Sequence, residues 1–428
     1  MRYSLSRKPL SLLPALITLS LITGCASKQP SSMPDTYSHK LTCAKGNHQV
    51  DDWRIDSSSV STPGTAAWSV SHTTLHGGKQ EGVSLIEIDN GVLQIRVIPT
   101  RGMSVLDITK GDIRLGWDSP VKEVVHPSYV DHESRGGLGW LEGFNEWMVR
   151  CGLEYAGHPG RDEFVTNTGG TAQMDLTLHG KIGNIPASSV EVVVDKEPPH
   201  RIRVRGTVNE RMFYGPKLEL TTEISTVPGS STFRIEDKVT NHGSGDQEIM
   251  LIYHANYGSS ILEEGAQLVA AAKQVTPMND HAAKATSTYP TYAAPTKDFV
   301  EEVFLITPYA DDNGNTTIML KNAAGDVGTS IAWSVKQLPY LTQWKNTAAN
   351  ADGYVTGLEP GTCHPFNRKV ERKFGRVAKL AADQTRSFAL DFGIHEGEEA
   401  VNEVAEKIAG IQNNRPTTVD ESAPTIPE

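Results

Sequence analysis

The stretch that decides the fold is VSLIEIDNGVLQIRVIPTRG, residues 83–102, in which apolar and polar side chains alternate on both sides of Asn90-Gly91. Alternation with a period of two is typical of a β-strand that has one buried face. Asn-Gly between two such runs is the strongest short signal for a hairpin turn. The stretch therefore predicts two antiparallel strands joined at Asn90-Gly91.

The same alternation continues through most of the chain, with Gly, Pro and Asn between the runs. The further predicted strands lie within residues 189–195, 200–210, 218–227, 231–241, 316–336 and 384–396. Only EAVNEVAEKIAGI, residues 399–411, has apolar residues at helical spacing. Short strands at about ten-residue spacing are typical of an all-β sandwich and argue against alternating βαβ units.

Composition divides the chain into five segments. The ends of the mature chain are rich in Ser, Pro and charged residues, which is typical of tethers and disordered tails. We expect a signal peptide over 1–24, a flexible tether over 25–40, a β-sandwich domain over 41–395, a helix over 396–411 and a disordered tail over 412–428.

The N-terminus predicts export and lipidation. A basic leader precedes an apolar run over residues 10–23, which is shorter than the roughly 20 residues that span a bilayer. Leu21-Ile22-Thr23-Gly24-Cys25 resembles the bacterial lipobox, in which the cysteine carries the lipid. With Ser27 after Ala26 and no aspartate beside Cys25, the signal favours the outer membrane of a Gram-negative cell, facing the periplasm. A plain secretory signal with an incidental cysteine is the alternative.

Charge and cysteine content exclude several classes of protein. A net charge of −11, a pI near 5.7 and scattered basic residues argue against nucleic acid as a partner. Besides Cys25 the chain has Cys43, Cys151 and Cys363, so at most one disulfide is expected. Cys151 has no basic neighbour except Arg150, so we reject it as a nucleophile. Potential ligands do not recur at metal-binding spacing, so we expect no required metal, with a surface cation left open, and no cofactor.

One histidine stands inside an apolar run: His254 in MLIYHANYGSSIL, residues 250–262. Without further information, the favoured interpretation is a core histidine that bonds to a backbone carbonyl, rather than a functional residue. The other residues suited to proton transfer or to binding hydroxyls are His126, His179, Glu359, Arg101, Asn145, Asn256 and Gln343. Trp140, Trp147 and Trp344 are either core residues or platforms for a sugar ring, and for Trp140 we favour the core.

Six motifs in one order carry a family resemblance. They are PTRGMSVLDI, LGWDSPV, GGLGWLEGFNEWMVRCGLEYAGHP, LHGKIGNIPA, YHANYGSSIL and GLEPGTCHP. Over roughly residues 80–395 the chain resembles the galactose mutarotase (aldose 1-epimerase) superfamily, and in particular an uncharacterised aldose-1-epimerase-like family (DUF4432-like). Where that superfamily carries LHGG and NHxYFNL, this chain has LHGK and YHANYG. The resemblance implies an all-β galactose mutarotase-like supersandwich with few short helices.

The resemblance also implies an activity and a site. His254 aligns with the general acid and Glu359 with the general base of an isomerase that interconverts the anomers, or epimers, of a sugar. His179 would bond a sugar hydroxyl or the ring oxygen, and Arg101, His126, Asn145, Asn256 and Gln343 would help bind the substrate. At ordinary pKa values of about 6.5 and 4.3, a carboxylate nearby would keep the imidazole protonated at neutral pH while the glutamate stays ionised.

Two other functions remain open from the sequence. The first is a non-catalytic carbohydrate-binding lipoprotein that kept the cleft but lost the chemistry. The second, less favoured, is a polysaccharide lyase or glycosidase, which needs a tyrosine or a second carboxylate at the bond that it cleaves. The expected partners are a small sugar and, through the lipid on Cys25, the membrane.

The lipobox-like motif predicts a mature chain that begins at lipidated Cys25. Cys25→Ser should move the protein from the membrane fraction to the soluble fraction, because the acyl chains that hold it would be absent. Fractionation and mass spectrometry of the N-terminus measure this. An unmodified N-terminus in the wild type, or a membrane-bound Cys25→Ser variant, would contradict the prediction.

Overall fold

In the computed structural model, which describes residues 35–427, β5 (Val83–Asp89) and β6 (Gln94–Ile98) form the antiparallel hairpin that the sequence predicts. The turn spans four residues, and its Asn90 Oδ1 accepts from the backbone N–H of Val92 and of Leu93. Asn90 Nδ2 donates to Thr226 Oγ1 at 2.7 Å. Asn90 therefore shapes the hairpin and also fastens it to a strand of the opposite sheet.

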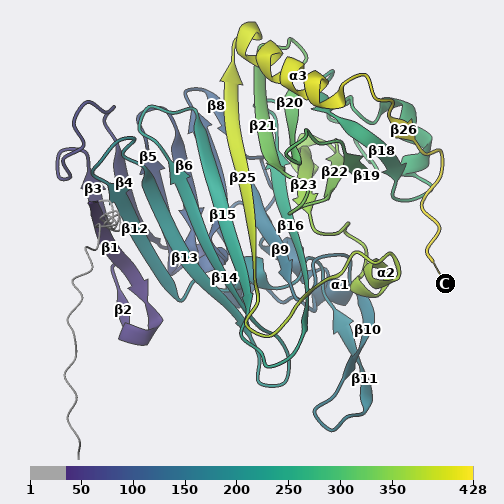
Figure 1. The fold of residues 1–428 in the computed structure, drawn as a ribbon, viewed down its shortest axis with the longest axis horizontal. Helices are drawn as coiled ribbons and strands as arrows, with labels where there is room; N and C mark the ends of the chain where they lie inside the picture. The colour runs from purple at the N-terminus through teal and green to yellow at the C-terminus, as the bar shows by residue number, and fades with distance from the viewer. Residues whose placement is uncertain (1–34, 428) are drawn as a thin grey trace, which may run out of the picture. The chain divides into compact units, whose positions relative to one another are not determined.

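Two large sheets face each other (Figure 1). The first contains, in spatial order, β17 (Gln267–Ala270), β20 (Asn315–Lys321), β21 (Val327–Ser334), β25 (Thr385–Glu396), β15 (Thr232–Asn241), β14 (Lys217–Thr226), β13 (Ile202–Arg211), β12 (Ser189–Asp195), β1 (Thr36–Cys43) and β2 (His48–Gln49). The second contains β26 (Thr418–Val419), β18 (Ala272–Pro277), β19 (Glu302–Pro308), β22 (Tyr340–Asn346), β23 (Val355–Gly361), β16 (Gln247–Tyr257), β9 (Met148–Leu153), β7 (Ser104–Lys110), β6, β5, β4 (Ser69–Leu75) and β3 (Trp53–Asp56), with β24 (Ala378–Leu380) beside β16 and β8 (Ile113–Leu115) beside β7.

The remaining elements are one separate hairpin, the helices and the 3-10 turns. A separate hairpin consists of β10 (Gly160–Val165) and β11 (Thr171–Leu176). The α-helices are α1 (Ser134–Gly137), α2 (Arg368–Lys373) and α3 (Glu398–Gln412). The 3-10 turns are η1 (Ala44–Gly46), η2 (Gly78–Gln80), η3 (Pro99–Arg101), η4 (Pro127–Tyr129), η5 (Gly139–Glu142), η6 (Ile182–Asn184), η7 (Ala282–Thr288) and η8 (Asn350–Asp352).

The main core lies between the two sheets. It joins buried residues of the first sheet, such as Val204 and Ile224, with residues of the second, such as Ile86, Ile95 and Leu251. Because successive strand residues point to opposite faces, the alternation seen in the sequence puts one apolar row of each strand into this core. The predicted all-β supersandwich is confirmed, and residues 35–427 belong to one compact unit.

The predicted late helix is α3, which covers one end of the first sheet (Figure 1). Val401, Ile408 and Ile411 are buried against Ala271 and Met319. The helix ends where Asn413 takes a left-handed conformation and its N–H bonds to the Ala409 carbonyl. Helical periodicity therefore predicted both the element and its buried face.

Two terminal segments are more ordered than their composition predicts. Residues 36–40, assigned to the flexible tether, belong to β1, which pairs with β12. In the predicted disordered tail, β26 pairs in parallel with β18, and the Arg415 guanidinium lies 3.9 Å from the Tyr309 ring centroid. Both predictions fail for the same reason: a strand at or next to a sheet edge gains main-chain hydrogen bonds and needs few apolar residues of its own.

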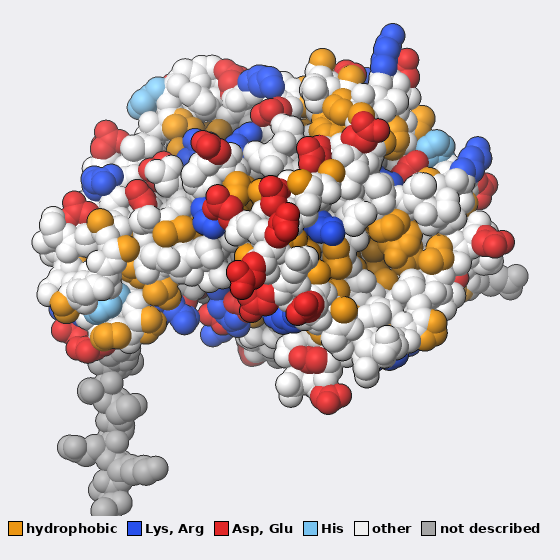
Figure 2. All heavy atoms as spheres, turned by 90° about the horizontal axis from the view of Figure 1, so that it is seen from above, with side chains coloured by type: hydrophobic (Ala, Val, Ile, Leu, Met, Phe, Trp, Pro, Cys, Tyr) orange, Lys and Arg blue, Asp and Glu red, His pale blue; other side chains and the backbone are white. Residues whose placement is uncertain are grey.

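The predicted signal peptide, Cys25 and the tether up to residue 34 lie outside the described residues. Within residues 35–427, no helix combines the length and the apolar character needed to cross a membrane. Figure 2 shows acidic and basic side chains interspersed with apolar patches over one face of the molecule.

A buried ion pair links the two sheets. Arg150 on β9 and Asp237 on β15 are both inaccessible to solvent, with Arg150 Nη2 3.0 Å from Asp237 Oδ1. Tyr253 on β16 donates its hydroxyl to Asp237 Oδ2 at 2.8 Å. Tyr253 precedes His254, so this network fixes the strand that carries the histidine singled out above.

We predict that Asp237→Asn destabilises the fold by about 3–5 kcal/mol, because it leaves the Arg150 charge buried without a partner. The free energy of unfolding, measured in urea, tests this. The matched control is Asp175→Asn, which breaks the Arg161–Asp175 pair at side chains that are 76% and 82% exposed. The control should leave the unfolding midpoint unchanged, and equal effects of the two substitutions would contradict the prediction.

Candidate functional site

The candidate site is a cavity of about 340 Å³ on the second sheet. The main core contains Leu251, Tyr253, Ala255 and Tyr257 of β16, so the intervening residues of that strand point away from the first sheet. His254 is one of them. The polar side chains that line the cavity are His158, His179, His254, Glu301, Thr342 and Glu359.

Strand register brings the central pair together. Ala255 on β16 pairs with Leu358 on β23, which sets His254 opposite Glu359 in the same register. Thr342 on β22 pairs with Glu359 from the other side. The three side chains thus form a row across adjacent strands, with His254 Nε2 3.3 Å from Glu359 Oε1. Residues more than a hundred positions apart in the sequence meet because their strands are neighbours.

Asn256 fixes the orientation of the imidazole. Its Nδ2 donates to the Glu146 carbonyl at 3.1 Å and to the His254 carbonyl at 3.2 Å. Its Oδ1 lies 2.8 Å from His254 Nδ1, so Nδ1 carries the hydrogen and Nε2 faces Glu359. The sequence assigned Asn256 to sugar binding, but the structure places it behind the histidine and outside the cavity lining.

Burial changes the expected protonation of the pair. Desolvation, and then the nearby His179, lower the pKa of His254 well below its usual value. Desolvation, and then the charge of Glu301, raise the pKa of Glu359 well above its usual value. Both shifts favour the neutral forms, in which protonated Glu359 donates to Nε2. The sequence predicted a charged imidazole and an ionised glutamate. That form and the neutral form contain the same shared proton, which lies on His254 in the first and on Glu359 in the second.

His179 forms a second wall of the cavity. Its Nδ1 donates to the Ala156 carbonyl at 2.9 Å, and its ring centroid is 5.3 Å from that of His254. Burial lowers the pKa of His179 to about 4, so the ring is neutral at pH 7. A side chain at the next residue, Gly180, would put its Cβ 2.2 Å from the Tyr155 carbonyl oxygen. This close approach explains the glycine of the LHG motif.

The strand that carries Glu359 also requires a glycine. A Cβ at Gly357 would lie 2.6 Å from Glu359 Oε1 and 3.1 Å from His254 Cε1. Gly357 shares a sheet face with Glu359 because the two are two residues apart. Its missing side chain leaves room for the carboxyl group to reach the imidazole.

Aromatic rings enclose the pair. The ring of Phe144 lies 5.4 Å from that of His254, and the ring of Trp344 lies 5.6 Å from it. Trp344 Nε1 donates to Glu301 Oε2 at 2.7 Å. Trp140, favoured as a core residue from the sequence, is buried and also lines the cavity beside His179. Rings of this kind pack well against the apolar face of a sugar.

Two predicted binding residues instead brace the loop that carries Phe144. Arg101 is fully buried, pairs with Glu146 Oε1 at 2.8 Å and donates to the Gly143 carbonyl at 2.6 Å. Asn145 donates from Nδ2 to the carbonyls of Val121 and Glu123. Neither side chain lines the cavity, and both are committed to partners within the protein.

The other two predicted binding residues also lie elsewhere. His126 accepts a hydrogen bond from the Ser128 N–H and begins η4. Gln343 is fully buried and donates to the Tyr289 carbonyl at 2.8 Å. Because Gln343 stands between Thr342 and Trp344 on β22, its side chain points to the opposite face of the sheet.

Three of the polar residues that line the cavity were not among the sequence-predicted site residues: His158, Glu301 and Thr342. The side chain of Thr342 must face the cavity once Trp344 is known to do so, because the two residues are two positions apart on β22. His158 and Glu301 lie in loops, where no periodic pattern predicts the direction of a side chain. Only the tertiary structure could place these two.

The described residues contain neither a metal-binding cluster nor a reactive cysteine. Residues 35–427 contain no group of three or more His, Cys, Asp or Glu side chains placed to hold a metal. Cys43, Cys151 and Cys363 are free. Burial raises the pKa of Cys151 well above its usual value, so this residue stays a thiol.

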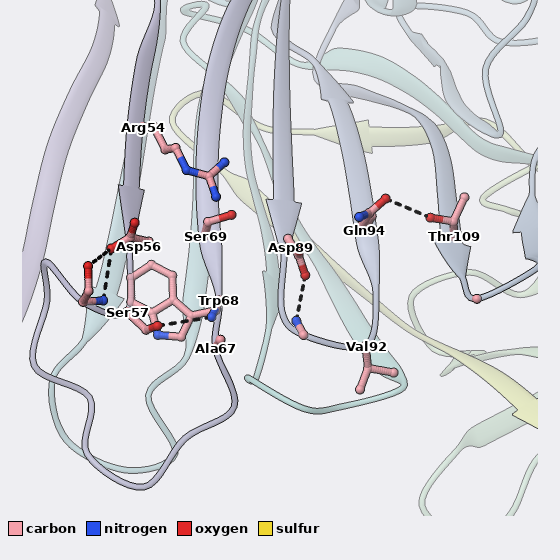
Figure 3. A pocket seen from close by; sticks show the side chains of 13 residues that line it. Arg54, Asp56, Ser57, Ala67, Trp68, Ser69, Asp89, Val92, Gln94 and Thr109 are labelled. Atoms are coloured by element: carbon pink, nitrogen blue, oxygen red, sulfur yellow. Dashed lines mark hydrogen bonds between the residues drawn. The ribbon is translucent and has the colours of Figure 1, made fainter.

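A second, wider hollow of about 630 Å³ lies at one end of β3, β4, β5 and β6 (Figure 3). Its polar groups largely bond to one another: Asp56 accepts from Ser58, Asp89 from the Gly91 N–H, and Gln94 from Thr109. None of the described residues that line it is a histidine. These bonds shape the hairpin ends, and the hollow offers no acid–base pair.

Two facing antiparallel sheets with a histidine–glutamate pair in a cavity on one of them define a galactose mutarotase-like protein. The chain belongs to the family described as "Domain of unknown function (DUF4432)", whose model matches residues 80–394. A structure from Klebsiella pneumoniae, provisionally described as an aldose 1-epimerase, is 43% identical over 91% of this chain and 100% of its own, with a TM-score of 0.86.

More distant structures share the fold. A galactose mutarotase-like protein from Clostridium acetobutylicum has a TM-score of 0.51 at 14% identity, over 81% of this chain and 99% of its own. Galactose 1-epimerase from Lactobacillus acidophilus has a TM-score of 0.51 at 12% identity, over 77% and 99%. The comparison with curated proteins found no match. The chain is thus an aldose-1-epimerase-like member of this fold.

We predict that Asn256→Asp raises the pKa of His254, because a carboxylate at Nδ1 stabilises the imidazolium form. Titration of the His254 ring followed by NMR should show the shift toward higher pH. Asn315→Asp, which adds the same charge at an exposed position of the other sheet, is the control and should leave the titration in place. An unchanged His254 titration in Asn256→Asp would contradict the hydrogen bond described above.

Proposed function

We propose that this protein interconverts the anomers of a reducing sugar by general acid–base catalysis. One observation carries the proposal: His254 Nε2 and Glu359 Oε1 lie 3.3 Å apart inside a cavity of about 340 Å³. The volume is at the small end of ligand pockets and suits a monosaccharide. The family resemblance and the solved structure from Klebsiella pneumoniae support the same activity.

The reaction needs one proton donor and one proton acceptor. The acceptor takes the proton of the anomeric hydroxyl while the donor protonates the ring oxygen, so the C1–O5 bond breaks and an open aldehyde forms. Rotation about C1–C2 exposes the other face of the aldehyde. Both proton transfers then reverse as the ring closes, which returns the pair to its starting state.

The pair can serve in this reaction because it holds a single proton. Ring opening moves the proton of one member onto the ring oxygen, and the other member gains the proton of the anomeric hydroxyl. The number of protons on His254 and Glu359 together is unchanged at every stage. By family resemblance His254 donates during ring opening and Glu359 accepts, which requires the shared proton to pass first from Glu359 Oε1 to His254 Nε2 across the 3.3 Å between them. The burial of both groups excludes water and strengthens the interaction of each with the charge that develops on the sugar.

Non-catalytic sugar binding is the second candidate. It is favoured by the aromatic lining, since Trp140, Phe144 and Trp344 suit a sugar ring whether or not a proton moves. Export to the cell envelope through a lipid on Cys25, which rests on the lipobox-like motif, fits either function.

We predict that His254→Gln and Glu359→Gln each slow anomer exchange by about a hundredfold to ten-thousandfold, because each removes a positioned proton carrier. The double variant should lose no more than the slower single variant, since the two groups act as a unit. Polarimetry of freshly dissolved α-sugars measures the rates.

The matched control is His126→Gln, which changes the same residue type outside the cavity and should retain the wild-type rate. Melting temperatures of all variants check that the fold persists. Wild-type protein that binds sugars yet exchanges none of them would overturn the catalytic proposal and leave the binding function.

A further inference from the structure

We propose that the cavity selects neutral aldoses with a methyl group at C6, the 6-deoxyaldohexoses, and rejects sugars with a charged group there. The inference rests on the proposed function only in taking the cavity as a sugar site. It comes from three features of the cavity: its charge, its apolar walls and its uncharged polar side chains.

The charge of the cavity excludes anionic sugars. Among the described residues that line it, no lysine or arginine occurs, whereas Glu301 and Glu359 both do. The buried Arg101 and Arg368 and the half-buried Arg376 on surrounding elements are each paired with a carboxylate, of Glu146, Asp162 and Glu371 respectively. A carboxylate or phosphate on the ligand would therefore lose its water without gaining a cation.

The walls of the cavity are mostly apolar. Besides the three aromatic rings, the lining includes Leu138, Leu141, Leu178 and Val303. Leu138 and Leu141 are 37% and 45% exposed, although both belong to the lining. Leucine surface left open beside a polar pair can be covered by an apolar group of the ligand. A methyl substituent there gains binding free energy from the burial of apolar surface, whereas a hydroxyl loses hydration.

The polar side chains of the cavity suit a neutral sugar. The acid–base pair engages the ring oxygen and the anomeric hydroxyl, which leaves the hydroxyls at C2, C3 and C4. His158, His179 and Thr342 line the cavity and can bond to these hydroxyls. Glu301 accepts from Trp344 through Oε2 and places a second carboxyl group in the lining, which opposes an anionic group at C6.

The test compares sugars that differ only at C6. D-Fucose, D-galactose and D-galacturonate share one ring stereochemistry and carry a methyl, a hydroxymethyl and a carboxylate respectively. L-Fucose with L-galactose, and L-rhamnose with L-mannose, repeat the first comparison on other rings. In the series that binds best, calorimetry at pH 7 should give a Kd for the deoxy sugar about ten- to a hundredfold below that of the hydroxymethyl sugar. D-Galacturonate should show no binding.

A variant ties the preference to the apolar wall. Leu141→Gln should reduce the ratio of hexose Kd to deoxyhexose Kd severalfold, because it offers the C6 hydroxyl a partner and removes the methyl contact. Val165→Gln changes an exposed apolar residue of the β10–β11 hairpin and should leave the ratio unchanged. Melting temperatures confirm that both variants fold.

The outcomes separate this inference from the proposed function. Hexose binding equal to or tighter than deoxyhexose binding in every series, or binding of galacturonate, overturns the inference even if anomer exchange is rapid. Preference for the deoxy sugar that is lost in Leu141→Gln supports it, even if polarimetry detects no exchange and the catalytic proposal fails.

Discussion

The register between β16, β23 and β22 is the constraint on which the candidate site depends. Ala255 pairs with Leu358, and Thr342 pairs with Glu359. These two pairings place His254, Glu359 and Thr342 side by side on adjacent strands. A slip of one residue in either pairing would turn the affected side chain to the opposite face of the sheet. The register is held by burial on both faces of β16, and by the Arg150–Asp237–Tyr253 network that joins this strand to the other sheet. The geometry of the candidate site is thus a consequence of core packing.

Burial also determines what the pair can do. Charged forms of His254 and Glu359 are disfavoured inside the protein, so one shared proton satisfies both groups at low cost. The imidazole can share this proton only if Nε2 faces the carboxyl group, and Asn256 enforces that orientation. Asn256 is held in turn by the carbonyl of Glu146, whose side chain pairs with Arg101. Arg101 therefore supports the site through two intermediates, without touching the cavity.

The sequence predicted the fold well, because period-two and helical patterns report directly which side of each element is buried. The hairpin at Asn90-Gly91 and helix α3 followed from this alone. Family resemblance located His179, His254 and Glu359, which do share one cavity. Residue type was a weaker guide: Gln343 and Arg101 suit sugars chemically, but the strand phase of one and the ion pair of the other direct them elsewhere. The ordered tail escaped prediction because its contacts, such as that of Arg415 with Tyr309, exist only in the folded molecule.

The site and the main core use different faces of the same strands. Tyr253 and Ala255 stabilise the sandwich, while His254 between them serves the cavity, so substitutions on one face need not disturb the other. The acid–base pair stands on rigid strands, whereas Leu138, Trp140, Leu141, His158 and Glu301 come from the segments between them. Loops tolerate change better than strands do. If the proposed proton chemistry holds, the pair can stay fixed on its strands while the loops change which ligand is held against it, so specificity is best sought in those loops.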